Sequence, residues 1–172
     1  MKGGLPAFID PLHLAREGAR LVGRLPLESM RRLRASCLED RGSVELELQF
    51  EQNAQGLGQM RGHIEAHLTV RCQRCLEPMG LTLKSDPRAL LLSGEDKQEP
   101  LAAGADMIVI TKPVSLVELV EDELLLAMPM MPMHPREACP AAPFLAPGAA
   151  ADEATSENRP FSVLRKLKRP RE

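Results

Sequence analysis

Two stretches in which apolar and polar residues alternate constrain the fold of this chain more than any other feature. They cover residues 44–50 and 60–70, and in both stretches every second residue is apolar or small. Such alternation is typical of a strand with one buried and one solvated face. Residues 51–58, between them, contain one Asn and two Gly and predict a turn. We therefore expect an antiparallel hairpin.

Shorter signals on both sides of the hairpin predict the rest of one domain. Asp10 and Pro11 mark a helix start, because Asp can cap free N–H groups and Pro loses no hydrogen bond there. The pattern predicts an α+β fold, with the N-terminal helices and one later helix packed on an antiparallel sheet of about five short strands. The predicted short elements are helices over about 10–19 and 27–34 and strands over 19–25, 81–84 and 107–111, while residues 88–92 form a further apolar run.

The later helix is predicted over residues 115–127, and it begins at a capping box formed by Ser115 and Glu118. At 100° per residue its apolar side chains fall on one broad arc, which we expect to face the core. The members of this arc are Leu116, Leu119, Val120, Leu124, Leu126 and Ala127.

Three further acidic residues of this helix are predicted to differ in their surroundings. Glu121 and Asp122 fall on the side opposite the apolar arc, where we expect solvent. Glu123 projects into the arc, where a carboxylate should be ion-paired or reach the rim of the core.

The candidate chemistry lies in three cysteines and one histidine. Cys72 and Cys75 form a C-x2-C pair at the tip of a predicted hairpin, and His134 and Cys139 follow far along the chain. Zinc takes four tetrahedral N or S donors, and C-x2-C supplies two from one tight turn. Unmetallated structural thiols are the alternative, since the fold could stand without the ion. A redox pair is disfavoured, because the motif follows an antiparallel strand and runs into Pro78 instead of a helix.

Composition excludes several classes of function. A net charge of -2 argues against a general nucleic-acid coat. Without Trp or Tyr and with four Phe, the chain lacks the aromatic platforms on which RNA modules stack bases. No phosphate loop or nucleophile motif is present, so neither an enzyme nor a small-molecule substrate is expected.

The same sequence predicts where the chain resides. No apolar run reaches the roughly 18 residues of a membrane span, and no secretory signal is visible. The four cysteines are therefore interpreted as reduced thiols in the cytoplasm. Cys37 has no partner at useful spacing and is expected to be a small buried apolar residue.

The predicted organisation is one domain over residues 1–139, an Ala/Pro-rich tether over 140–159 and a basic amphipathic segment over 160–172. That last segment could dock on the domain, on a partner protein or on RNA phosphates, or remain a frayed cationic tail. Arg71 and Arg74 flank the cysteines and are further candidates for contact with a partner. The candidate contacts in the last segment are Phe161, Arg165, Lys166, Lys168 and Arg169.

Several segments in this order and spacing together resemble one protein family. They are VRCQRCLEP over 70–78, LVEDELLLAMP over 119–129, PMH over 132–134 with Cys139, and PFSVL over 160–164 with Leu167-Lys168. They are similar to the YceD family, the large ribosomal RNA subunit accumulation proteins, over nearly the whole chain. The 140–159 tether is unusually rich in Ala and Pro, and no family property extends to it.

The resemblance implies a ribosome-biogenesis factor needed for accumulation of 23S rRNA and of the large subunit, without a known catalytic activity. Implied partners are pre-ribosomal RNA, a large-subunit ribosomal protein or an rRNA-processing enzyme. The family's C-x2-C positions correspond to Cys72 and Cys75, and its acidic helix corresponds to Glu121, Asp122 and Glu123. A small zinc-binding or thiol-redox protein that uses the cysteine pair is the alternative function.

Overall fold

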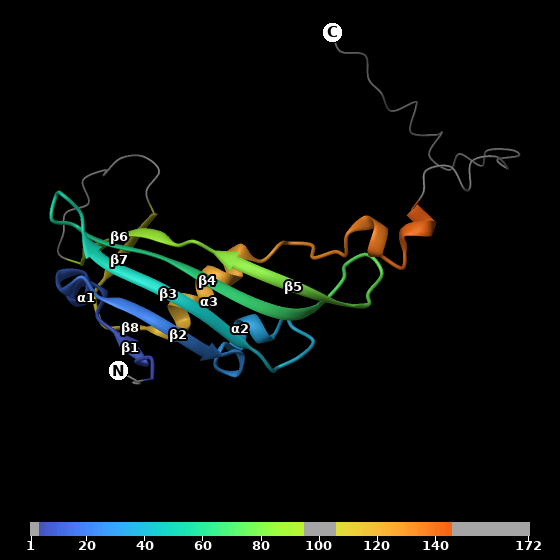
Figure 1. Cartoon of the computed structure of the whole chain (residues 1–172), viewed down its shortest axis with the longest axis horizontal. Helices are drawn as coiled ribbons and strands as arrows, with labels where there is room; N and C mark the ends of the chain where they lie inside the picture. The colour runs from blue at the N-terminus through green and yellow to red at the C-terminus, as the bar shows by residue number, and fades with distance from the viewer. Residues whose placement is uncertain (1–3, 95–105, 146–172) are drawn as a thin grey trace, which may run out of the picture. The chain divides into compact units, whose positions relative to one another are not determined.

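A computed structural model describes residues 4–94 and 106–145 of the chain (Figure 1). The chain divides into two compact units, Met1–His134 and Pro135–Glu172. The whole predicted segment 160–172 lies outside the described residues, and with it Phe161 and the four cationic candidate contacts. Of the predicted tether, only residues 140–145 are described.

The first unit is built on a six-stranded sheet in which β2, β3, β4, β6 and β7 follow one another in space and β5 also pairs with β4. β4 is 14 residues long, and β6 and β5 pair with successive parts of it. The strands are β2 (Arg20–Pro26), β3 (Ser43–Gln52), β4 (Gly58–Arg71), β5 (Pro78–Ser85), β6 (Arg88–Ser93) and β7 (Asp106–Ile110).

The predicted hairpin is confirmed as β3 and β4, which pair antiparallel with Leu46 opposite Ile64 and Phe50 opposite Met60. All four of these side chains are buried, so the alternation identified the core face of both strands. The predicted sheet was wrong in two details, since it has six strands and β6 pairs with β7 in parallel. Residues 94–105 separate those two strands, which is long enough for the crossover that a parallel pair requires.

The helices of the first unit begin where the capping residues predict. The Asp10 carboxylate accepts N–H bonds from Leu12 and His13, both at 3.1 Å, at the start of α1 (Pro11–Glu17). The predicted 27–34 helix is instead two pieces, η1 (Leu27–Ser29) and α2 (Arg31–Arg34), because Met30 between them is not helical. A two-stranded ribbon of β1 (Phe8–Ile9) and β8 (Val114–Ser115) was not predicted.

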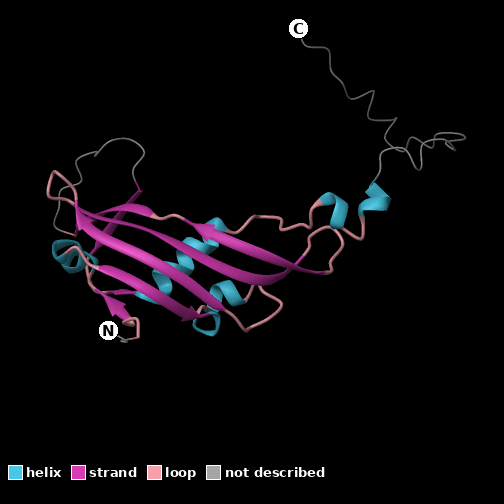
Figure 2. Cartoon of the chain, viewed as in Figure 1, coloured by secondary structure: helices cyan, strands magenta, loops and turns pink. Residues whose placement is uncertain are grey.

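One face of the sheet carries the helices, as Figure 2 shows for α2 and for α3 (Leu116–Ala127), which pass behind the strands. α1 packs on β3 and β4, and α3 packs on β4 and β5. Leu116, Val120 and Leu124 of α3 are fully buried against this core. Each such side chain stabilises the fold by about 1.5–3 kcal/mol relative to exposure.

The predicted apolar arc of α3 was displaced around the helix. Leu126, placed within the arc, is 82% exposed, whereas Glu121, placed in solvent, is only 4% exposed. The reason is that α3 contacts α2 as well as the sheet, so a second side of the helix is covered. In the part of the chain that the structure describes, no helix has the length and apolar character to span a membrane.

In the second unit, the described residues form η2 (Arg136–Ala138) and η3 (Ala142–Leu145). Cys139 follows η2 directly, and its N–H donates to the Arg136 carbonyl at 3.4 Å.

Candidate metal centre

The turn between β4 and β5 is a tight knuckle that contains both cysteines of the C-x2-C pair. The Cys72 N–H donates to the Glu77 carbonyl at 2.9 Å, and the Leu76 N–H donates to the Cys72 carbonyl at 2.9 Å. Leu76 has φ of 67°, a left-handed conformation that costs a non-glycine residue about 1–2 kcal/mol. The chain therefore accepts local strain to keep the loop this short.

Residues 128–134, here called the Met/Pro segment, follow α3 and lie against this knuckle. The Gln73 N–H donates to the Pro132 carbonyl at 2.8 Å, and the His134 N–H points at Cys72 Sγ at 3.5 Å. These contacts join residues about sixty positions apart, and they bring His134 to the cysteine pair.

Three of the predicted ligands, Cys72, Cys75 and His134, lie together within the first unit. Their candidate ligand atoms are within 4.8 Å of one another, and Cys75 Sγ lies 3.4 Å from His134 Nδ1. Zn–S bonds of about 2.3 Å and Zn–N bonds of about 2.0 Å at a tetrahedral angle place S and N about 3.5 Å apart. The observed separation thus suits two ligands of one ion, and it also suits a thiol–imidazole hydrogen bond.

The surroundings of Cys72 favour its thiolate. Burial of the sulfur raises its pKa, but hydrogen bonds from the N–H groups of Cys75, His134 and Arg74 more than offset burial and lower the pKa to about 5. The Arg74 N–H lies 3.5 Å from the sulfur. Thiolate is the form in which cysteine ligates metals, so the chemistry of this sulfur is compatible with a metal ligand.

Cys139 belongs to the second unit, five residues after His134. Five residues span at most about 17 Å, so chain connectivity keeps its sulfur within reach of a metal held by His134. Cys139 therefore stays the predicted fourth ligand beside Cys72, Cys75 and His134.

Cys37 is not part of this group. It is half-buried, and its thiol lies 3.3 Å from the Leu33 carbonyl. Burial is the main cause that raises the pKa of this thiol, and the nearby Asp40 carboxylate adds to the shift. It therefore lacks the thiolate character of Cys72 and provides a matched control for experiments on the cysteines.

The two arginines beside the cysteines differ in exposure. Arg71 is exposed at the end of β4. Arg74 is half-buried, with Nη2 3.7 Å from Met133 Sδ and Nη1 buried without a hydrogen-bond partner among the described residues. Arg71 therefore belongs to the surface around the knuckle, whereas the Arg74 guanidinium group is partly buried beside it.

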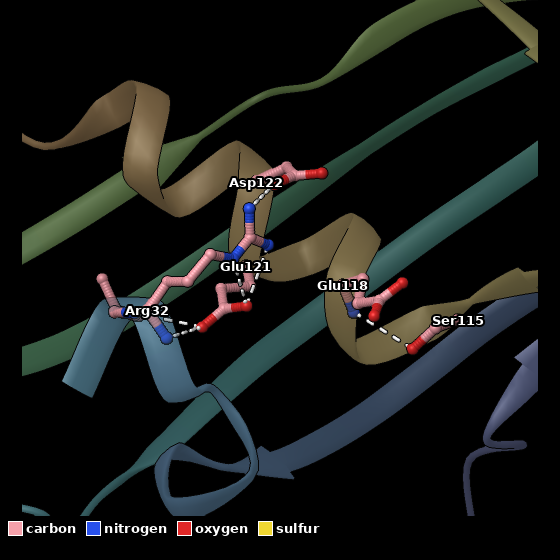
Figure 3. A network of polar contacts seen from close by, with 6 residues as sticks. Arg32, Ser115, Glu118, Glu121 and Asp122 are labelled. Carbon is pink, nitrogen blue, oxygen red and sulfur yellow. Dashed lines mark hydrogen bonds and ion pairs between the residues drawn. The ribbon is translucent and has the colours of Figure 1, made fainter. Parts of the chain in front are cut away.

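The acidic residues of α3, predicted as contacts for a partner, make contacts inside the fold. Glu121 Oε1 accepts from the N–H groups of Arg32 at 2.6 Å and Leu33 at 3.0 Å (Figure 3). Its Oε2 lies 2.9 Å from both Nε and Nη2 of Arg32. Glu121 thus satisfies N–H groups at the start of α2 and fastens α2 to α3.

This network holds Glu121 ionised. Burial alone would raise the pKa of Glu121, but the Leu33 N–H and the Arg32 guanidinium and N–H outweigh it, and the net pKa is lowered. The neighbouring Asp122 is exposed and pairs with Arg32 Nη1 at 2.6 Å. Glu123 is half-buried, as its place in the predicted arc required, and it accepts a hydrogen bond from the Ser85 hydroxyl at 3.0 Å.

The contact between Gln73 and the Met/Pro segment was not predicted in detail. The sequence feature that points to this contact is the set of three prolines, Pro129, Pro132 and Pro135. They forbid a helix and leave an extended chain whose carbonyl groups are free to accept hydrogen bonds. A backbone carbonyl presented in this way can accept from a distant loop, as Pro132 does.

Comparison with known proteins identifies relatives over almost the whole chain. Residues 60–168 match the family model described as large ribosomal RNA subunit accumulation protein YceD. The large ribosomal RNA subunit accumulation protein YceD of Haemophilus influenzae is 30% identical over 167 residues, which is 95% of this chain and 96% of the relative. No solved structure matches significantly. The chain belongs to the YceD family of large ribosomal RNA subunit accumulation proteins.

Proposed function

We propose that this protein is a non-enzymatic cytoplasmic factor needed for 23S rRNA accumulation and large-subunit assembly. It acts by binding pre-ribosomal RNA, a large-subunit ribosomal protein or an rRNA-processing enzyme. The observation that carries this proposal is the match to a named accumulation protein over 95% of the chain. Because that relative has nearly the same length, the role is assigned to the whole chain.

We further propose that Cys72, Cys75, His134 and Cys139 hold one structural zinc ion. Support comes from the 3.4 Å separation of Cys75 Sγ and His134 Nδ1 and from the N–H groups around Cys72 Sγ. Three thiolates and one imidazole fill a tetrahedral zinc shell and leave no position for a substrate. The ion would fasten the β4–β5 knuckle to the end of the Met/Pro segment.

A thiol-redox function is the second candidate, and the low pKa of Cys72 favours it. The two candidates differ in accessibility, since Cys72 is fully buried and a redox thiol must meet its substrate. Alkylation by iodoacetamide separates them. A zinc site predicts slow alkylation of Cys72 that a chelator accelerates, whereas a redox thiol reacts fast with or without the chelator.

The main proposal is tested by replacing the chromosomal gene with variants and measuring the ratio of 23S to 16S rRNA. Deletion and Cys72→Ser should both lower that ratio and the yield of large subunits on sucrose gradients. Val22→Ser, an exposed change on β2 outside the knuckle, is the control and should leave both unchanged. A normal ratio in the deletion strain would overturn the proposed function. If deletion lowers the ratio but Cys72→Ser does not, the protein has this function but the knuckle is not needed for it.

A further inference from the structure

Several exposed apolar side chains belong to the knuckle, to the Met/Pro segment or to the residues next to them in the sequence. Met130 is completely exposed, and Leu126, at the end of α3, is 82% exposed. The other exposed apolar side chains are Leu38 after α2, Leu76 in the knuckle, and Met131 and Met133 in the Met/Pro segment. Leu38 and Met130 line one groove, and apolar side chains that share a surface in this way mark interaction sites more often than isolated exposed residues do.

A groove of about 380 Å³ lies within this surface. One wall is residues 35–38 after α2, and the floor is Val70 and Arg71 at the end of β4 with Gln73 of the knuckle. The other wall belongs to the Met/Pro segment and consists of Met128, Pro129, Met130 and Pro132. Both walls are fixed to the floor, because the Leu38 N–H donates to the Thr69 carbonyl at 2.8 Å and the Gln73 N–H donates to the Pro132 carbonyl at 2.8 Å. The groove is therefore preformed, which lowers the entropic cost of binding.

The charge at the groove differs from that of the open sheet face. On the sheet, four cations each pair with a carboxylate, and the pairs are Arg20–Glu47, Arg24–Glu45, Arg61–Glu51 and Lys84–Glu65. Arg71, in the groove lining, forms no ion pair with any described residue, and Arg74 beside it contacts Met133 sulfur instead of a carboxylate. Uncompensated positive charge therefore stands beside an apolar groove.

We propose that this groove binds a peptide segment of a protein partner that presents apolar side chains and a carboxylate, with the carboxylate pairing with Arg71. Methionine side chains suit such a site because they adapt to the shape of a partner. RNA fits less well, since the lining holds no aromatic residue for base stacking and two cations neutralise few phosphates. The inference rests on the proposed function, and it names the class of partner as protein.

The test begins with selection of short random peptides displayed on phage against the purified full chain. Enriched peptides should carry apolar residues beside Asp or Glu, and their affinity is measured by fluorescence anisotropy. Arg71→Glu and Met130→Ser should each weaken binding by about tenfold or more, and replacing the peptide's acidic residue with Lys should restore binding to Arg71→Glu. Lys112→Glu and Val22→Ser, exposed changes outside the groove lining, are the matched controls and should have no effect.

The inference is overturned if enriched peptides lack this pattern, or if both groove variants bind within about twofold of the wild type. It is also overturned if short polyuridine, and not peptide, binds in a manner that depends on Arg71. The rRNA measurement separates this inference from the proposed function. Suppose that deletion lowers 23S rRNA, whereas Arg71→Glu loses peptide binding but keeps a normal level of 23S rRNA. The proposed function then stands, and the groove has no role in it. If deletion has no effect on 23S rRNA, the proposed function is wrong, and the anisotropy measurements alone decide whether the groove binds peptide.

Discussion

Replacing Glu121 with glutamine should destabilise the protein although it removes only one charge from the surface of a helix. The carboxylate is 4% exposed and takes four contacts, two from the N–H groups of Arg32 and Leu33 and two from the Arg32 guanidinium. Glutamine can still accept N–H bonds with one oxygen, but its amide group is a donor facing the donors of Arg32.

The magnitude follows from the difference between charged and neutral hydrogen bonds. Bonds to a charged group contribute about 1.5–3 kcal/mol and neutral bonds about 0.5–1.5 kcal/mol, so each of four contacts loses about 1 kcal/mol. Because the Arg32 side chain is 53% exposed, solvent reduces the share from its guanidinium. We expect Glu121→Gln to lower the free energy of unfolding by about 2 kcal/mol, and Glu121→Ala to lower it by about 3–5 kcal/mol.

The loss should depend on pH. The folded protein lowers the pKa of Glu121 below its ordinary value of 4.5, so its stabilising effect is complete above that value and disappears as pH falls through the folded-state pKa. Urea unfolding from neutral pH to about pH 3.5 should therefore show the wild type and Glu121→Gln converging at the acid end.

Asp122→Asn is the control, because Asp122 pairs with the same Arg32 but has a side chain that is 58% exposed. It should change stability by less than about 0.5 kcal/mol. Equal effects of the two substitutions, or a Glu121→Gln loss that does not vary with pH, would refute the argument that the buried, ionised carboxylate holds α2 to α3.

Three other changes test separate parts of the fold. Ser115→Ala removes the side-chain cap of α3, whose oxygen accepts the Glu118 N–H at 3.3 Å, and should cost about 1 kcal/mol in urea unfolding. Leu76→Gly should raise the free energy of unfolding by about 1 kcal/mol, because glycine adopts the backbone φ of 67° without strain and the lost side chain is 61% exposed. A lower free energy of unfolding would show that the contacts of Leu76 outweigh the strain. His63 has a raised pKa caused mainly by its hydrogen bond to Asp86, so Asp86→Asn should lower the pKa of His63 in an NMR titration, while an unchanged value would contradict that cause.

The sequence predicted the parts of the structure that depend on local pattern. Alternation over residues 44–50 and 60–70 determines which face of β3 and β4 is buried, because a strand has a period of two. Asp10 and Ser115 located helix starts through capping chemistry that involves only neighbouring residues.

Features set by long-range packing could not be predicted in the same way. The apolar arc of α3 assumes one covered side, yet α2 covers a second side and buries Glu121 against Arg32. The parallel pairing of β6 and β7 depends on how the chain returns to the sheet, which short apolar runs do not specify. Proximity of His134 to Cys75 was inferred from residue type alone, and its geometry came from the fold of the Met/Pro segment.

The zinc content of the chain, purified without added metal or affinity chelators, tests the proposed metal centre most directly. Inductively coupled plasma mass spectrometry should find about one zinc per chain in the wild type and in Cys37→Ser, and a large loss in Cys72→Ser and His134→Ala. Wild-type protein that is folded and free of zinc, and that takes up none on dialysis against zinc, would contradict the assignment of Cys72, Cys75, His134 and Cys139 as a metal site.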